Sequence, residues 1–159
     1  MKDILLFSWD KNLDYGQKLL ADLPEDRVVF QPAENMNHPA WVFSHLNAYH
    51  PVITAMIRGE VFDDPKEHPF GMKSKPVTDA SVYPTKSKLV EAFVRGHHDV
   101  TEALRAADEA IIHQAVPLER WVKYIPNIGA ALGYLMILHE STHLGQISAW
   151  RRVQGMAMV

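Results

Sequence analysis

Hydrophobic residues recur at helical spacing in four stretches of the chain, and connectors rich in proline and glycine separate these stretches. Within each stretch the apolar positions return every three or four residues, so they share one face of a helix. No stretch alternates apolar and polar residues in the manner of a half-buried strand. The pattern therefore predicts a protein built only from helices.

The first predicted helix covers about residues 3–23 and stops before a proline. The second begins at Asn37-His38-Pro39, where a side-chain cap is followed by a proline in the first turn. Pro51 lies inside this second helix and removes one backbone hydrogen bond. We therefore expect a kink or a fresh helical start near His50.

The third predicted helix covers about residues 85–107, and the fourth runs from Pro126-Asn127 to about Val153, with Gly155 as its stop. Four long helices predict an all-α fold, a four-helix bundle. At 159 residues the chain is expected to form a single domain, residues 1–159.

The connector over residues 59–84 is too long for a tight antiparallel hairpin. An extended chain reaches ~3.3 Å per residue, so this connector can cross the length of a helix and start the third helix parallel to the second. Its apolar residues Phe62, Phe70 and Met72 predict a packed lid rather than a floppy linker.

Composition removes several classes of function. Sixteen Lys and Arg against nineteen Asp and Glu give a formal charge of -3, and no stretch gathers the cations into a stripe, so nucleic acid is not an expected partner. No apolar window approaches the ~18 residues of a membrane span, and the N-terminus has no targeting pattern. We therefore expect a cytoplasmic protein with no membrane partner.

The chain contains 9 histidines and no cysteine. Without cysteine the protein itself can supply neither a disulfide, nor an iron–sulfur cluster, nor a thiol nucleophile. Any sulfur chemistry must arrive with a substrate.

The segment His139-Glu140-Ser141-Thr142-His143 places two histidines four residues apart on one helix face. At this spacing both imidazoles can bind one metal ion at ~2.1 Å. Counted at 100° per residue, both fall on the main apolar stripe of the fourth helix and should point into the core. The alternative is a pair of buried histidines held by core hydrogen bonds.

The same five residues match the His-Glu-x-x-His pattern of zinc proteases. Such proteases take a third ligand from further along the chain, but no His, Asp or Glu follows His143. No β-sheet edge is predicted that could hold a peptide substrate. These two absences disfavour a protease.

A third ligand must therefore come from upstream, and His45 is the best candidate because it lies centrally in the apolar stripe of the second helix, between Trp41 and Tyr49. His38 and His97 could border the same site. The remaining histidines are expected at the surface or in connectors: His50, His68, His98 and His113.

Two motifs resemble those of the DinB/YfiT-like superfamily of metalloenzymes: Asn37-His38-Pro39-Ala40-Trp41-Val42-Phe43-Ser44-His45-Leu46, and His139-Glu140-x-x-His143-Leu144-Gly145-Gln146-Ile147. The resemblance covers most of the chain. It implies an up-down-down-up bundle, often a homodimer, that binds one divalent ion, zinc or nickel with iron or manganese as alternatives. Matched residue by residue, the ligands would be His45, His139 and His143. Members with known chemistry include mycothiol-dependent isomerases and bacillithiol S-transferases.

Three neutral imidazoles leave open positions on a metal ion, as in catalytic sites. A bound water could serve as a hydrolytic nucleophile, or a bound external thiol could attack an electrophile. Glu140 is a candidate general base, but it points 60–100° away from the two histidines by helical geometry (about 100° per residue), towards a helix flank, so a supporting or salt-bridge role is preferred. Gln146 is better aimed for a hydrogen bond to a histidine or to a bound water.

The fourth helix is also apolar on its far side, at Ile137 and Leu144. A helix that is apolar all round is buried on both sides, which predicts a homodimer through this helix. The leading hypothesis is a metal-dependent thiol S-transferase or hydrolase that acts on a small-molecule substrate. The alternative is a dimeric metal-binding or stress-response protein without catalysis.

Overall fold

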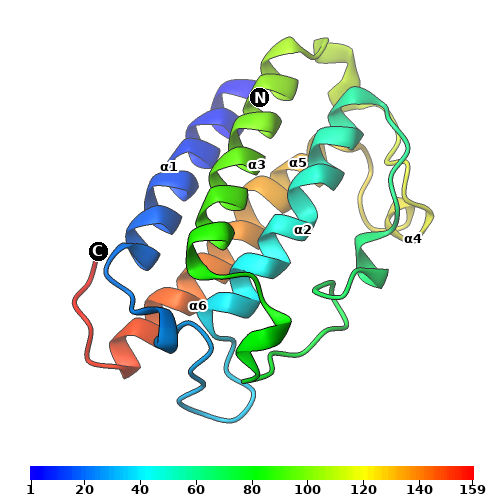
Figure 1. Cartoon of the computed structure of the whole chain (residues 1–159). Helices are drawn as coiled ribbons and strands as arrows, with labels where there is room; N and C mark the ends of the chain where they lie inside the picture. The colour runs from blue at the N-terminus through cyan, green and yellow to red at the C-terminus, as the bar shows by residue number, and fades with distance from the viewer.

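The computed structural model describes every residue from Met1 to Val159 and contains helices but no strands (Figure 1). Its long helices are α1 (Lys2–Ala21), α2 (Pro39–Arg58) and α3 (Lys86–Ala106). The last long helix is continuous but changes type, from α5 (Ile128–Leu132) through a π-helical segment (Gly133–His139) to α6 (Glu140–Val153). A short helix, α4 (Glu119–Val122), lies in the preceding connector. The predicted all-α bundle is confirmed.

Isolated 3₁₀ turns punctuate the connectors at Glu25–Arg27, Pro65–Glu67, Ala80–Val82 and Glu109–His113. None of the helices is both long enough and apolar enough to cross a membrane.

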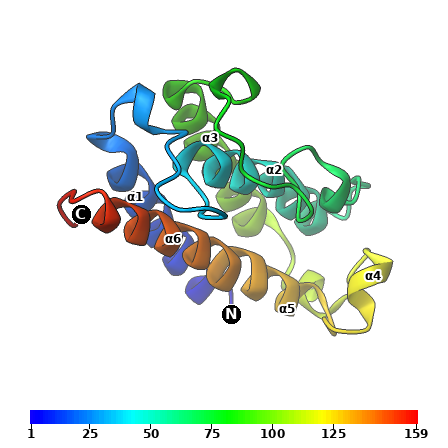
Figure 2. The same cartoon turned by 90° about the horizontal axis from the view of Figure 1, so that it is seen from below.

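Contacts between the long helices give their relative directions. The start of α1 meets the end of α3, where Lys2 donates to the carbonyl of Ala107, so these two helices are antiparallel. Near their starts, Asn47 of α2 donates to the carbonyl of Leu89 of α3 at 3.1 Å, and the two helices run parallel (Figure 1). The last helix runs alongside α1 in the same direction, as the view from below shows (Figure 2).

The 59–84 connector returns from the end of α2 to the start of α3, as its length predicts (Figure 1). Phe70 stacks on Tyr83 with ring centroids 5.4 Å apart, and Phe62 packs against the core. Met72, in contrast, is 58% exposed. Asp64 accepts two hydrogen bonds from Arg120, at 2.7 and 2.8 Å, which ties this connector to α4. The connector is therefore packed along the bundle at both ends.

Helix α2 continues through Pro51, so the expected fresh start near His50 is wrong. Proline still lacks the N–H that would bond to the preceding turn. Sixteen of the twenty α2 residues are buried, and tertiary packing of this extent outweighs the local cost of one missing bond.

The π-helical segment changes the direction of every side chain that follows it. A π turn contains more residues than an α turn, so side-chain directions counted at about 100° per residue across Gly133–His139 accumulate an error. Leu144, predicted on the outer side, is fully buried and faces Gly16 of α1. The large apolar side chains of this helix that do reach solvent are those of Tyr134, Leu138 and Val153.

The start of α2 depends on the fully buried His38. Its Nδ1 accepts a hydrogen bond from the backbone N–H of Trp41 at 3.3 Å, so the ring proton lies on Nε2, which donates to the carbonyl of Val77 at 2.9 Å. His38 therefore caps α2 and does not border the histidine site, and burial lowers its pKa.

We predict that His38→Asn makes stability less sensitive to acid. Between pH 7 and pH 5.5 the unfolded chain gains a proton on His38 while the folded chain resists it, because the folded pKa is lowered; stability is therefore lost as the pH falls. Asparagine keeps a capping oxygen but does not titrate. The decrease in the urea midpoint between pH 7 and pH 5.5 should be smaller in His38→Asn than in the wild type. In the control His98→Asn, at an exposed position, this decrease should equal that of the wild type. Equal pH sensitivity in all three proteins would contradict the prediction.

Candidate metal centre

Three histidines from two helices converge on one point in the bundle. His45 lies in the middle of α2, His139 ends the π-helical segment and His143 lies in the first turn of α6. Their ring centroids are 4.6 to 5.1 Å apart, and one nitrogen of each ring lies within 4.8 Å of the others. The structure thus brings together the three residues that the sequence proposes as ligands.

Hydrogen bonds on the far side of two of the rings orient them. Nδ1 of His45 donates to the carbonyl of Phe70 at 2.6 Å, and Nδ1 of His143 donates to the side-chain oxygen of Gln146 at 3.0 Å. Asn37 donates to the same Gln146 oxygen, which identifies that atom as the acceptor. With their protons on Nδ1, both rings present Nε2 lone pairs for binding.

The spacing of these nitrogens fits a metal ion. Nε2 of His45 and Nε2 of His139 are 3.0 Å apart. Two nitrogens at ~2.1 Å from one metal are separated by roughly 3.0–3.4 Å for angles between octahedral and tetrahedral. A ring of three imidazoles suits zinc, nickel, iron or copper rather than magnesium or calcium.

All three imidazoles are neutral near pH 7, as ligands must be. Burial lowers the pKa of His45 to about 4 and that of His139 to about 3, and proximity to His143 adds to both effects. Burial also lowers the pKa of His143, against the opposing effect of its bond to Gln146.

A solvent-open pocket of about 260 Å³ has the three histidines at its base. The other lining residues are aromatic, apolar or cationic: Trp41, Tyr49, Met72, Arg120, Trp121 and Tyr134. Trp41 stacks on the His45 ring with centroids 4.8 Å apart. No carboxylate lines the pocket.

Neither of the two weaker catalytic candidates reaches this pocket. Gln146 lies behind His143 and accepts a hydrogen bond from it, as the sequence predicts. Glu140 does not lie on a helix flank; it is 1% exposed and faces the bundle interior. Its Oε1 lies 2.8 Å from Nε2 of His97, and its Oε2 lies 3.3 Å from Nε2 of His50.

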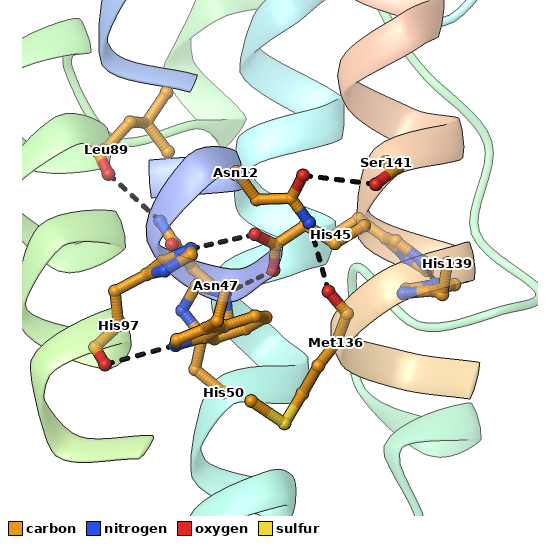
Figure 3. A network of polar contacts seen from close by, with 11 residues as sticks. Asn12, His45, Asn47, His50, Leu89, His97, Met136, His139 and Ser141 are labelled. Carbon is orange, nitrogen blue, oxygen red and sulfur yellow. Dashed lines mark hydrogen bonds and ion pairs between the residues drawn. The ribbon is translucent and has the colours of Figure 1, made fainter. Parts of the chain in front are cut away.

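The expected surface position of His50 is also wrong, since this residue is 2% exposed. The reason is that α2 is covered on several sides, so the side chain of His50 points at α3 instead of solvent. Apolar residues all round α2 were the sequence signal for this burial. His97 is buried beside His50 and does not reach the site of His45 (Figure 3). The expected exposure of the other three is confirmed: His68, His98 and His113.

A comparison with family models matches residues 8–147 to the DinB superfamily. The chain belongs to the DinB superfamily. The match includes His45, His139 and His143, and metal association is general in this superfamily. No curated protein matches the chain.

We predict that Gln146→Leu weakens zinc binding about 10- to 100-fold, because the His143 Nδ1 proton loses its acceptor and the ring loses its orientation. Gln146→Glu keeps an acceptor and should bind zinc at least as tightly as the wild type. Gln154→Leu, at the end of the same helix, is the matched control. Competition with a zinc-sensitive chelating dye gives the affinities, and an unchanged affinity in Gln146→Leu would show that this contact does not support the site.

Proposed function

We propose that this DinB superfamily protein is a metal-dependent enzyme that transfers a low-molecular-weight thiol to a small electrophile. His45, His139 and His143 would hold the ion, zinc or nickel, with iron or manganese as alternatives. The observation that carries the proposal is the convergence of three neutral imidazoles at the base of an open pocket. A divalent ion there would act as a Lewis acid that lowers the pKa of a bound thiol or water, so that the proton is released to solvent.

The pocket lining favours thiol transfer over hydrolysis. A hydrolase of this type needs a general base near the attacking water, but the lining residues include no Asp or Glu. Glu140 is enclosed on the other side of the last helix, so it cannot take a proton from a molecule in the pocket. Because the chain has no cysteine, the sulfur would come from the thiol substrate.

Arg120 would contribute to binding this substrate. Two of its guanidinium nitrogens, Nε and Nη2, bond to Asp64, which holds the side chain at the pocket wall. Nη1 has no partner within the chain, so it can donate to a carboxylate of an anionic thiol. The aromatic walls exclude water from the electrophile.

Metal analysis followed by an activity screen tests this proposal. His45→Ala and His139→Ala should each lose one equivalent of metal relative to the wild type, whereas the exposed His68→Ala should lose none. With a panel of low-molecular-weight thiols and monochlorobimane, the wild type should form the conjugate and both metal-site variants should fall to the uncatalysed rate.

Three results would count against the proposal. Full metal content in His45→Ala would place the third ligand elsewhere. Stoichiometric metal without conjugation of any thiol would favour the non-catalytic metal-binding or stress-response protein. Hydrolysis of small esters or amides that depends on the same three histidines would favour a hydrolase.

We further propose that the protein is a homodimer through the last helix and α1. Ile4 and Phe7 of α1 and Leu138 of the last helix are each at least 60% exposed, and α1 packs beside the π-helical segment. Light scattering after size exclusion should show a dimer for the wild type and for Val61→Glu on the connector, and a monomer for Leu138→Glu. A monomeric wild type at micromolar concentration would exclude the dimer.

A further inference from the structure

We infer that His50, His97 and Glu140 form a second metal centre, which lies in the core of the bundle and takes a divalent transition-metal ion. The three residues come from α2, α3 and the first position of α6. Figure 3 shows His50 and His97 turned towards one another, apart from the pair formed by His45 and His139. This inference does not depend on the proposed enzymatic function.

The geometry of the cluster fits one shared ion. One ligand atom from each residue lies within 4.8 Å of the others. The two carboxylate oxygens of Glu140 lie 2.8 Å from Nε2 of His97 and 3.3 Å from Nε2 of His50. Ligands at ~2.1 Å from a common ion are separated by roughly 3.0–3.4 Å, and the two distances from Glu140 to the rings are close to this range.

Hydrogen bonding within the protein satisfies this cluster only in part, through one bond of 3.3 Å between Nε2 of His50 and Oε2 of Glu140. Nε2 of His97 and Oε1 of Glu140 are close, but they are not aligned as a hydrogen bond, and neither atom has another partner. No Lys or Arg forms an ion pair with Glu140, although its side chain is only 2% exposed. Buried polar atoms without partners are uncommon in folded proteins, and a bound ion is one of the few explanations. A cation would compensate the carboxylate and use the lone pairs of both imidazoles.

The donor set selects the kind of ion. Two imidazole nitrogens and one carboxylate are typical ligands of zinc and of non-haem iron(II). Magnesium and calcium prefer sites made entirely of oxygen atoms. The centre would therefore take the same class of ion as the first, but with a negative ligand in place of the third imidazole.

Neighbouring residues fix the two rings. Trp9 of α1 stacks on His97 with centroids 3.9 Å apart, and its indole N–H donates to the His97 carbonyl at 3.1 Å. Gly96 lies against His50 so closely that a Cβ atom there would be 2.2 Å from Nδ1 of that ring. Only glycine leaves room for the imidazole at this point.

Access and burial separate the roles of the two centres. The first lies at the base of a pocket, whereas every side chain of the second is at most 3% exposed. A groove of about 400 Å³ between α2 and α3 reaches His50 and Gly96 and gives an ion a route inward. Because the ligands come from three helices and leave no space for substrate, the second ion would clamp the bundle and hold Glu140, and with it the adjacent ligand His139.

Zinc stoichiometry in a background without the first centre tests the inference. In His45→Ala/His143→Ala, refolding from denaturant with excess Zn²⁺ removes any barrier to entry, and dialysis then removes loose ions. Elemental analysis should find one equivalent, against two in the wild type. Adding the isosteric Glu140→Gln should abolish this equivalent, whereas adding His98→Gln, on the exposed side of α3, should leave it unchanged.

If the His45→Ala/His143→Ala protein contains no zinc, the inference is overturned. It is also overturned if this protein still holds one equivalent of zinc after Glu140→Gln is added. The background protein loaded with Co²⁺ gives a readout that does not require Glu140→Gln to fold. X-ray absorption should then show two imidazoles and at least one oxygen around the ion. Coordination by three imidazoles, or by water oxygens alone, would overturn the inference. A different result is expected if the first centre does not bind metal. The wild type and the double variant would then contain equal amounts of zinc.

Discussion

The antiparallel contact between α2 and the last long helix places imidazoles and a carboxylate in an apolar interior, where they lose the water that would otherwise solvate them. Desolvation keeps His45 and His139 neutral, so their Nε2 lone pairs remain available to a ligand. The rest of the structure is arranged around this constraint: acceptors lie behind the rings, aromatic faces lie beside them, and one side is open to solvent.

The connectors are part of the same arrangement. The carbonyl of Phe70, in the long connector, fixes the tautomer of His45, and the pairing of Asp64 with Arg120 closes one wall of the pocket. These contacts explain why a long connector without a regular helix is packed in place, since releasing it would leave both the ring proton and the guanidinium without partners.

Periodicity alone predicts the four long helices within about two residues and selects His45, His139 and His143 from nine histidines. The helix prediction depends on short-range rules such as a proline in the first turn of α2, at Pro39. The choice of histidines depends on the spacing of two of them on one face, and their role as ligands stays a prediction. The family resemblance supports the same three residues.

The second cluster could not be predicted in this way. Angles counted along one helix do not say what packs against it, so His50 was assigned to solvent although α3 covers it. Glu140 is misplaced for the same reason: its angle to His139 and His143 does not say that His50 of α2 and His97 of α3 pack against it. The paths of the connectors cannot be predicted either, because their sequences have no helical periodicity. For this reason the sequence does not predict the contacts made by Phe70, Asp64 and Arg120.

We propose that His45, His139 and His143 hold one metal ion at the base of the pocket. Anomalous diffraction from zinc-loaded crystals, recorded on both sides of the zinc absorption edge, tests it most directly. We predict a peak about 2.1 Å from one nitrogen of each ring. Zinc bound only at the exposed histidines, with no peak among these three rings, would contradict it.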